Sequence, residues 1–152
     1  MDTPVYQGSC FCGKVTYEVM GKPLISAYCH CTLCQRLHSS AFIHTVHFSE
    51  TSFKWTCAES CESVTDTYPV AGKPWKMRYR CKECGATVAS HNSKANNWSI
   101  RGAQLERDET GKIKAWDELK PTAHMFYGTR MLDINDDLGK WEGYENQSKK
   151  IS

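Results

Sequence analysis

Three cysteine thiols fall within the six-residue segment Cys29-His30-Cys31-Thr32-Leu33-Cys34. Cysteines this close along a chain rarely reach the geometry of a disulfide with one another. A soft divalent metal ion, in contrast, is bound by several thiolates that converge from one short stretch of chain. The segment therefore predicts a metal site with three protein ligands, one fewer than a closed tetrahedral zinc site needs. Three ligands and an open position are typical of catalytic zinc.

Two further cysteine pairs lie on either side of this segment, and a glycine follows each pair. The pairs are Cys10 and Cys12, followed by Gly13, and Cys81 and Cys84, followed by Gly85. Glycine tolerates the positive φ and the close backbone approach that a turn beside a metal-bound sulfur requires. Four thiolates make a closed zinc site of the structural kind. We therefore predict that these four cysteines bind one zinc ion and clip the N-terminal segment to the middle of the chain.

Cys57 and Cys61 remain outside both groups. We expect them to be free thiols at the surface rather than metal ligands. Two alternatives stay open: the Cys-x-x-x-Cys loop, or a histidine, could supply the ligand that closes the three-thiol site. Whether that site is catalytic or structural depends on this fourth position.

The composition describes one soluble globular domain. The chain has 152 residues, of which 40% are hydrophobic and 24% charged, and its net charge is +2. This charge gives no reason to expect nucleic acid or an acidic membrane as a partner. No apolar run approaches the length of a membrane span, and the polar residues around Pro4 predict no secretory signal. Nine cysteines without such a signal favour a reducing, cytoplasmic location, where clustered thiols bind metals.

Short runs of alternating polar and apolar residues predict a mainly β fold of short antiparallel strands. In residues 13–20, for example, Val15, Tyr17 and Val19 alternate with polar residues. Further strands are predicted at 24–28, 41–48, 53–56, 64–70, 75–80, 86–90 and 98–101, with a late strand around residues 125–127. The strands on either side of the Cys81–Cys84 pair predict a hairpin with zinc at its tip. We assign residues 1–145 to one domain and residues 146–152 to a disordered tail.

One short helix is predicted over residues 32–37, and it begins inside the three-thiol segment. Thr32 is a candidate N-cap for this helix. A helix that starts here directs its first backbone N–H groups toward the thiols. We therefore expect the helix to help hold thiolates, or an anionic substrate, at this site.

Five motifs occur in a fixed order between residues 6 and 144. They are Cys-x-Cys-Gly at Cys10, Cys-His-Cys-x-x-Cys-x-Arg from Cys29 to Arg36, Cys-x-x-Cys-Gly at Cys81, Pro-Thr-x-His-Met from Pro121 to Met125, and Asp-Leu at Asp137. This order resembles that of the glutathione-dependent formaldehyde-activating enzyme family, which also includes centromere protein V.

The resemblance implies a β-tent zinc fold with structural zinc on the four-cysteine group. It also implies a second, catalytic zinc on Cys29, Cys31 and Cys34, beside a site for glutathione as co-substrate. The implied activity is that of a carbon–sulfur lyase, which makes or breaks glutathione adducts of formaldehyde or a related small electrophile. The expected partner is thus a small-molecule thiol adduct, with neither nucleic acid nor membrane, and a homodimer is allowed.

Other side chains near the three-thiol segment are candidates for binding or proton transfer. Zinc with three thiolates carries about one net negative charge by ligand counting. Arg36 is expected to offset that charge and, together with His30, to contact the glutathione co-substrate. His30 and His44 are candidates for proton transfer to a carbonyl oxygen. A packing role is the alternative for His30, and His124 is expected to be a hydrogen-bonded core histidine.

Two hypotheses of other classes compete with the enzyme. A non-catalytic zinc module could bind glutathione or a protein partner, and a fourth protein ligand should then close the three-thiol site. A cytoskeletal or chromosomal binder, by analogy with centromere protein V, ranks last. The sequence contains no long basic extension, and a net charge of +2 gives weak electrostatic steering.

Overall fold

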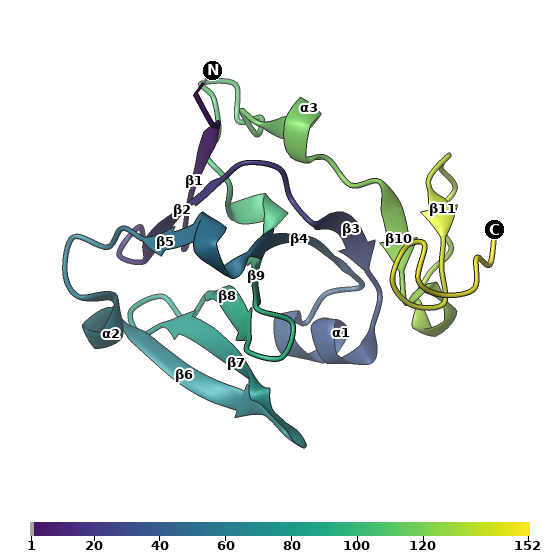
Figure 1. Cartoon of the computed structure of the whole chain (residues 1–152), viewed down its shortest axis with the longest axis horizontal. Coiled ribbons are helices and arrows are strands. Elements are labelled where there is room, and N and C mark those ends of the chain that lie inside the picture. The colour runs from purple at the N-terminus through teal and green to yellow at the C-terminus, as the bar shows by residue number, and fades with distance from the viewer. Residues whose placement is uncertain (1) are drawn as a thin grey trace.

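The chain folds into two β-sheets that share one core, in the computed structural model, which describes residues 2–152 (Figure 1). The smaller sheet has the order β1-β2-β5, with strands Val5–Ser9, Thr16–Met20 and Phe53–Trp55. The larger sheet has the order β11-β10-β3-β4-β9-β8-β7-β6. In that order its strands span Gly139–Lys140, Ala123–Met125, Ile25–Cys29, Ile43–Ser49, Asn97–Arg101, Thr87–Asn92, Lys73–Cys81 and Thr65–Val70. Neighbours are antiparallel except β10, which is parallel to β3 and β11, so the mainly β prediction is confirmed.

The helices are short and few. α1 spans Thr32–His38, α2 spans Cys61–Val64 and α3 spans Trp116–Leu119, and the 3-10 turns are η1 (Glu50–Ser52), η2 (Gly102–Gln104) and η3 (Tyr127–Thr129). Across residues 2–152, none of the helices combines the length and the apolar character needed to cross a membrane.

The main core lies between the two sheets. Val15, Tyr17 and Val19, whose alternation predicted a half-buried strand, are all fully buried. They belong to the same hydrophobic cluster as Val46 of β4 and Ile100 of β9 in the larger sheet. Each buried aliphatic side chain of this kind contributes about 1.5–3 kcal/mol relative to exposure. Alternation in sequence therefore fixes which face of each sheet turns inward.

Strand register brings a second set of residues to the opposite face of the larger sheet. Cys29 of β3 pairs with Ile43, and Thr45, two residues further along β4, pairs with Arg101 of β9. On the next strands, Ser99 pairs with Ser90, and Ser90 pairs with Arg78 of β7. Paired residues share a face, and side chains alternate along each strand. A row of side chains from Cys29 to Arg78 thus crosses five strands on one surface.

The predicted hairpin with a cysteine pair at its tip is present. β7 ends at Cys81, β8 begins at Thr87, and Cys84 lies in the turn between them. The glycines after the two cysteine pairs have positive φ, at 86° for Gly13 and 77° for Gly85. This left-handed backbone explains why glycine follows the second cysteine of each pair.

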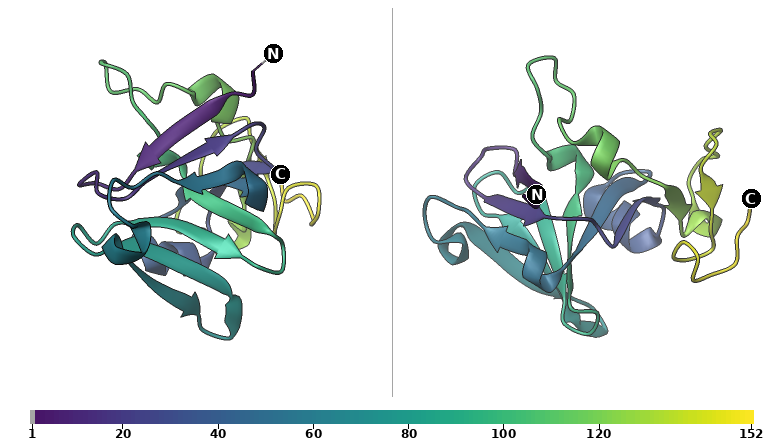
Figure 2. Two further views of the ribbon diagram at one scale, coloured as in Figure 1. Left: turned by 60° about the vertical axis from the view of Figure 1, so that its left-hand side comes forward. Right: turned by 45° about the horizontal axis from the view of Figure 1, so that its top comes forward.

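The prediction of a disordered tail over residues 146–152 is wrong for this structure. The backbone N–H of Lys140 donates to the carbonyl of Ser152 at 2.8 Å, and the N–H of Glu142 donates to Lys149 at 2.9 Å. Trp141 and Lys150 also form a β-bridge. The final residues therefore fold back on β11, and Figure 2 shows this C-terminal segment at one side of the molecule, away from the N-terminal strands. A polar composition suggested fraying, but backbone hydrogen bonds do not depend on side-chain polarity.

Cys57 and Cys61 are joined in a disulfide, so the prediction of two free surface thiols is also wrong. The bond spans the bend between β5 and α2, where four residues of separation bring the two Cα atoms to 5.4 Å. A bent chain provides the short Cα–Cα distance that an extended segment would not. Neither cysteine closes the three-thiol site.

Candidate metal and thiol-binding site

Cys10, Cys12, Cys81 and Cys84 converge although 69 residues separate the inner two. All four sulfur atoms lie within 4.8 Å of one another. The Sγ atom of Cys12 lies 3.6 Å from the Sγ atom of Cys10 and 3.7 Å from the Sγ atom of Cys81. A tetrahedral zinc ion with Zn–S bonds of about 2.3 Å separates its sulfurs by about 3.8 Å. The group therefore fits zinc, and it is placed to clip the loop between β1 and β2 to the β7–β8 hairpin.

The second cysteine group is built by the junction of β3 and α1. Cys29 is the last residue of β3, Cys31 is the N-cap of α1, and Cys34 lies in its first turn. The Sγ atoms of Cys29 and Cys34 are 3.5 Å apart, and all three sulfurs lie within 4.8 Å. The N–H of Cys34 donates to the Sγ of Cys31 at 3.2 Å. The predicted helix is present, but its cap is Cys31 rather than Thr32, because a thiol can accept the bond that a hydroxyl would.

The pKa values of the three thiols are shifted in different directions. Hydrogen bonds with the neighbouring thiols raise the pKa of Cys29 and lower the pKa of Cys31. The backbone N–H groups of Cys34 and Leu33 lower the pKa of Cys31 further. Cys31 is thus the first of the three to become a thiolate, which is the form that binds metals. Among the described residues, no fourth Cys, His, Asp or Glu joins the group, so one coordination position would remain for a ligand.

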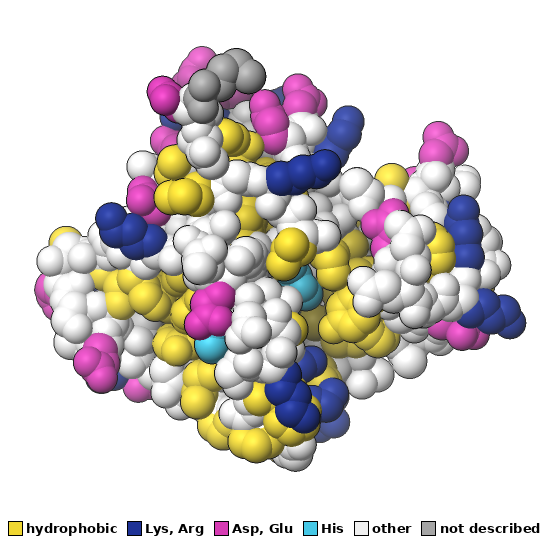
Figure 3. Space-filling view, in the orientation of Figure 1, with side chains coloured by type: hydrophobic (Ala, Val, Ile, Leu, Met, Phe, Trp, Pro, Cys, Tyr) yellow, Lys and Arg dark blue, Asp and Glu magenta, His cyan; other side chains and the backbone are white. Residues whose placement is uncertain are grey.

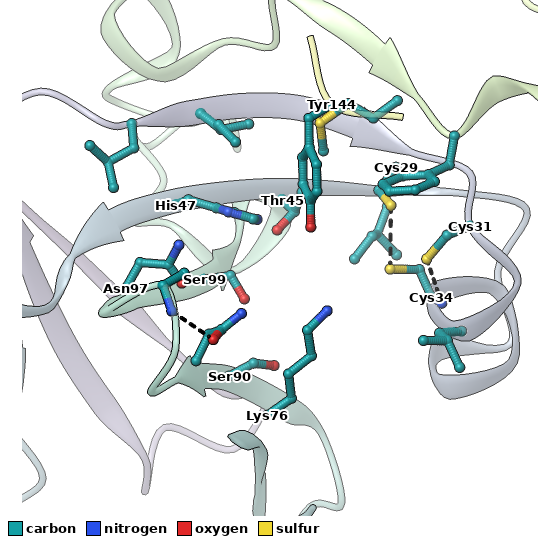
Figure 4. A pocket seen from close by; sticks show the side chains of 18 of the residues that line it. Cys29, Cys31, Cys34, Thr45, His47, Lys76, Ser90, Asn97, Ser99 and Tyr144 are labelled. Atoms are coloured by element: carbon teal, nitrogen blue, oxygen red, sulfur yellow. Dashed lines mark hydrogen bonds between the residues drawn. The ribbon is translucent and has the colours of Figure 1, made fainter. Parts of the chain in front are cut away.

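A cavity of about 660 Å³ opens beside the three thiols, over the face of the sheet where the register aligns Cys29, Thr45, Ser90 and Arg78. This volume suits a molecule of peptide or drug size. Figure 4 shows the thiols at one end of the cavity, with Tyr144 and Lys76 pointing into it from opposite sides.

The charged groups of the cavity wall are all basic. They are Lys73, Lys76, Arg78 and Arg101, and none of the lining residues is an Asp or a Glu. Burial, together with Lys73 and Arg78, lowers the pKa of Lys76. Lys and Arg side chains also gather below the centre of the face shown in Figure 3. The wall therefore favours anionic ligands.

His47 and Tyr144 supply titratable groups to the same wall. Burial, and then the charges of Arg101, Lys76 and Arg78, lower the pKa of His47 to about 4, so His47 is neutral at physiological pH. Burial, and then the nearby thiols, raise the pKa of Tyr144. Tyr144 consequently keeps its proton and can donate a hydrogen bond to a ligand.

Comparison with protein families shows the family to which the chain belongs. Residues 5–129 match the family described as glutathione-dependent formaldehyde-activating enzyme. The chain belongs to this family. The match covers most of the chain, including both cysteine groups and β3, β4, β7, β8 and β9 of the cavity wall.

A solved structure supports the fold of this family member. A Rhodobacter sphaeroides protein, known from a crystal structure, is similar with a TM-score of 0.51 and 20% sequence identity, over 70% of this chain and 96% of that chain. At this identity the likeness concerns the fold alone. Comparison with curated protein sequences finds no match.

In this member of the glutathione-dependent family, two of the predicted histidines lie on the other side of the sheet. His44 alternates with Ile43 and Thr45, which line the cavity, and its Nε2 lies 2.8 Å from the Oγ of Ser26. His30 follows Cys29 and is completely buried, with its Nε2 2.8 Å from Nδ1 of His124. Neither histidine lines the cavity, because one residue along a strand moves a side chain to the opposite face.

His124 is the hydrogen-bonded core histidine that was predicted. It has no exposed surface, and its Nε2 lies 2.8 Å from the carboxylate of Asp136. Burial opposes the charge of Asp136, but hydrogen bonds from Lys140 and His124 outweigh it and lower the pKa of Asp136 to about 2. Burial and His124 in turn lower the pKa of His30 to about 4. This chain of groups holds β10 and β11 against β3.

Arg36 lies on the exposed side of α1 and does not line the cavity. The cations that do line it, on β7 and β9, were missed by sequence reasoning. Alternation assigns them to the solvent side, because Arg78 lies between Met77 and Tyr79 and Arg101 follows Ile100. No local signal could therefore have found them. Tyr144 was missed as well, because it enters the cavity from the C-terminal segment, far along the chain.

Proposed function

We propose that this protein is a zinc-dependent carbon–sulfur lyase that makes or breaks glutathione adducts of formaldehyde or a related small electrophile. The observation that carries the proposal is the three-thiol group of Cys29, Cys31 and Cys34 at the end of an open, basic cavity, with no fourth protein ligand among the described residues. Membership of the family supports the class of thiol and electrophile.

The donor set of the site suits a zinc ion. Three soft sulfur ligands select zinc over hard cations such as Mg²⁺. Zinc held by Cys29, Cys31 and Cys34 would act as a Lewis acid that keeps a substrate thiol deprotonated at neutral pH. The four-cysteine group would hold a second, structural zinc.

Side chains of the protein bind the ligand and transfer one proton. In the condensation, the thiol sulfur forms a bond to the aldehyde carbon, and the thiol proton passes to the aldehyde oxygen. The hydroxyl of Tyr144 and the ammonium of Lys76 point into the cavity and are the groups we assign to hold and deliver this proton (Figure 4). Cleavage of the adduct runs the same proton transfer in reverse.

The alternative of a non-catalytic zinc module requires a closed site. A fourth Cys, His, Asp or Glu beside Cys29, Cys31 and Cys34 would have supported it, and the described residues provide none. The enzyme is therefore the function that the geometry favours.

The test combines metal content with turnover. The purified protein should contain two zinc ions per chain and accelerate the exchange between glutathione, formaldehyde and S-hydroxymethylglutathione, measured by exchange NMR. Cys31→Ser should lose one zinc ion and at least about 100-fold in rate, as expected when an essential ligand of a catalytic metal is removed.

Cys61→Ser is the matched control, because Cys61 belongs to neither thiol group. It should keep both zinc ions and the full rate. Full turnover by Cys31→Ser after loss of its zinc would refute the proposed function.

A further inference from the structure

Two arginines are buried side by side in the cavity wall without an acidic partner. Arg78 is 9% exposed and Arg101 is 6% exposed. Nη1 of Arg78 and Nη2 of Arg101 both donate to the same acceptor, the Oγ of Ser90, at 2.7 and 2.8 Å. Neither guanidinium forms a salt bridge with any described residue.

This arrangement is unfavourable for the folded protein by itself. Two buried like charges repel each other, and removing each charge from water is unfavourable unless an opposite charge compensates. Ser90 supplies a neutral hydroxyl, and Nε of Arg101 has no hydrogen-bond partner at all. Burial and the neighbouring Arg78 accordingly lower the pKa of Arg101 to about 10, which leaves it charged at neutral pH.

The thiol group compensates only part of this charge. The wall contributes four cations and no carboxylate. Three thiolates around a divalent zinc ion would leave about one negative charge. The cavity therefore keeps an excess of positive charge that a bound anion would neutralise.

We propose that Arg78 and Arg101, joined through Ser90, form a carboxylate-binding subsite, so that the ligands of this cavity are thiols or thiol adducts that carry a carboxylate. The inference rests on the proposed function only for the position of the ligand's sulfur. Guanidinium groups bind a carboxylate through parallel N–H···O bonds, and a pair of them suits its two oxygens.

The spacing across the sheet agrees with such a ligand. Arg101 lies on β9, two strands from the Cys29 strand, and strands in a sheet are about 4.8 Å apart. The backbones of β3 and β9 are thus about 10 Å apart across the sheet. The long side chain of Arg101 reduces the distance between its guanidinium and the sulfur of Cys29 on the same face. A carboxylate a few bonds from the sulfur can span it.

The carboxylate can come from two sources. It can belong to the thiol, as in glutathione, or to the electrophile, as in an α-oxo acid such as glyoxylate. The physical subsite is the same in both cases, and the experiment separates them.

The test is calorimetric binding of S-methylglutathione and, separately, of glyoxylate. S-methylglutathione has both carboxylates and no free thiol, so its binding does not depend on catalysis. The wild-type protein should bind at least one of the two ligands, and Arg78→Met should weaken that binding at least about tenfold, the loss expected for a charge-assisted bidentate contact. Arg78→Met should also melt at the same temperature or higher, because it removes an unpaired buried charge.

Arg80→Met is the matched control. Arg80 lies on the same strand but is exposed and paired with Asp66 at 2.9 Å, so this variant should bind within about twofold of wild type, since a surface ion pair contributes little. If Arg78→Met does not fold, Arg78→Lys keeps the charge and loses the planar fork, and should still weaken binding about threefold or more.

Comparison of the two ligands identifies the source of the carboxylate. Loss of affinity when the glycine carboxylate of S-methylglutathione is esterified assigns it to the thiol, whereas tight binding of glyoxylate assigns it to the electrophile. Binding by a folded Arg78 variant within twofold of wild type, or no binding of either ligand to wild type, would overturn the subsite. An inactive protein that still shows the Arg78-dependent binding would refute the lyase and leave the subsite standing.

Discussion

At the residue scale, one step along a strand decides whether a side chain can take part in chemistry. His44 and His47 both lie on β4. His47 shares the cavity face with Thr45, and His44 turns to the opposite face, where it contacts Ser26. The sequence led us to select His44 and not His47, because alternation alone does not show which face of the strand lines a cavity.

His47 gives a prediction on pH dependence. Its pKa of about 4 in the folded chain is below that of an unfolded histidine, which is about 6.5. Protonation therefore favours unfolding, and the stability contributed by neutral His47 is complete above about pH 6.5 and is lost as the pH falls toward 4. We expect His47→Asn to reduce the loss of unfolding free energy between pH 7 and pH 5 by about 1–2 kcal/mol, measured by urea denaturation.

The comparison of variant and wild type cancels the acid release of metal, which affects both proteins. An identical pH dependence for the two would show that His47 is protonated equally in the folded and unfolded chains.

At the scale of elements, the C-terminal segment forms a strap along β11, the edge strand of the larger sheet. Its backbone pairs with Lys140 and Glu142 through four hydrogen bonds, which involve Lys149, Ile151 and Ser152. The same segment places Tyr144 against the ring of Phe126, with ring centroids 5.3 Å apart. The strap thereby holds one wall of the cavity.

Deletion of residues 149–152 should lower the free energy of unfolding by about 1–3 kcal/mol, because each backbone hydrogen bond contributes about 0.5–1.5 kcal/mol net. It should also weaken glutathione binding, since Tyr144 loses support. Lys149→Ala, which keeps the backbone bonds, is the control for denaturation and calorimetry. A deletion variant as stable as wild type would show that the strap adds no net stability.

At the scale of the whole molecule, the four-cysteine group joins the two sheets at a point where they have no shared strand. Cys10 and Cys12 follow β1 of the smaller sheet, and Cys81 and Cys84 lie at the tip of a hairpin in the larger one. Binding of a metal ion here stabilises only the folded chain, because the unfolded chain has no preformed site.

Cys84→Ser should therefore lose one zinc ion per chain and on the order of 3 kcal/mol or more of unfolding free energy. Metal analysis and chemical denaturation test this, with Cys61→Ser as the control outside both groups. A Cys84→Ser protein with full stability and a single zinc ion would mean that the clip is dispensable for the fold.

The short-range pattern of the sequence determined both cysteine groups, the hairpin with a cysteine pair at its tip, the helix that starts at the thiols and the strands around Val15 and Val46. Cysteines a few residues apart and period-two alternation are local features of the sequence. They can therefore be interpreted without knowledge of the fold. Tertiary structure alone decided the disulfide of Cys57 and Cys61 and the anchoring of residues 146–152. It also decided which side chains face the thiols: Arg78, Arg101 and Tyr144 come from distant parts of the chain. Only the strand register, set by packing of the whole sheet, brings such residues to one surface.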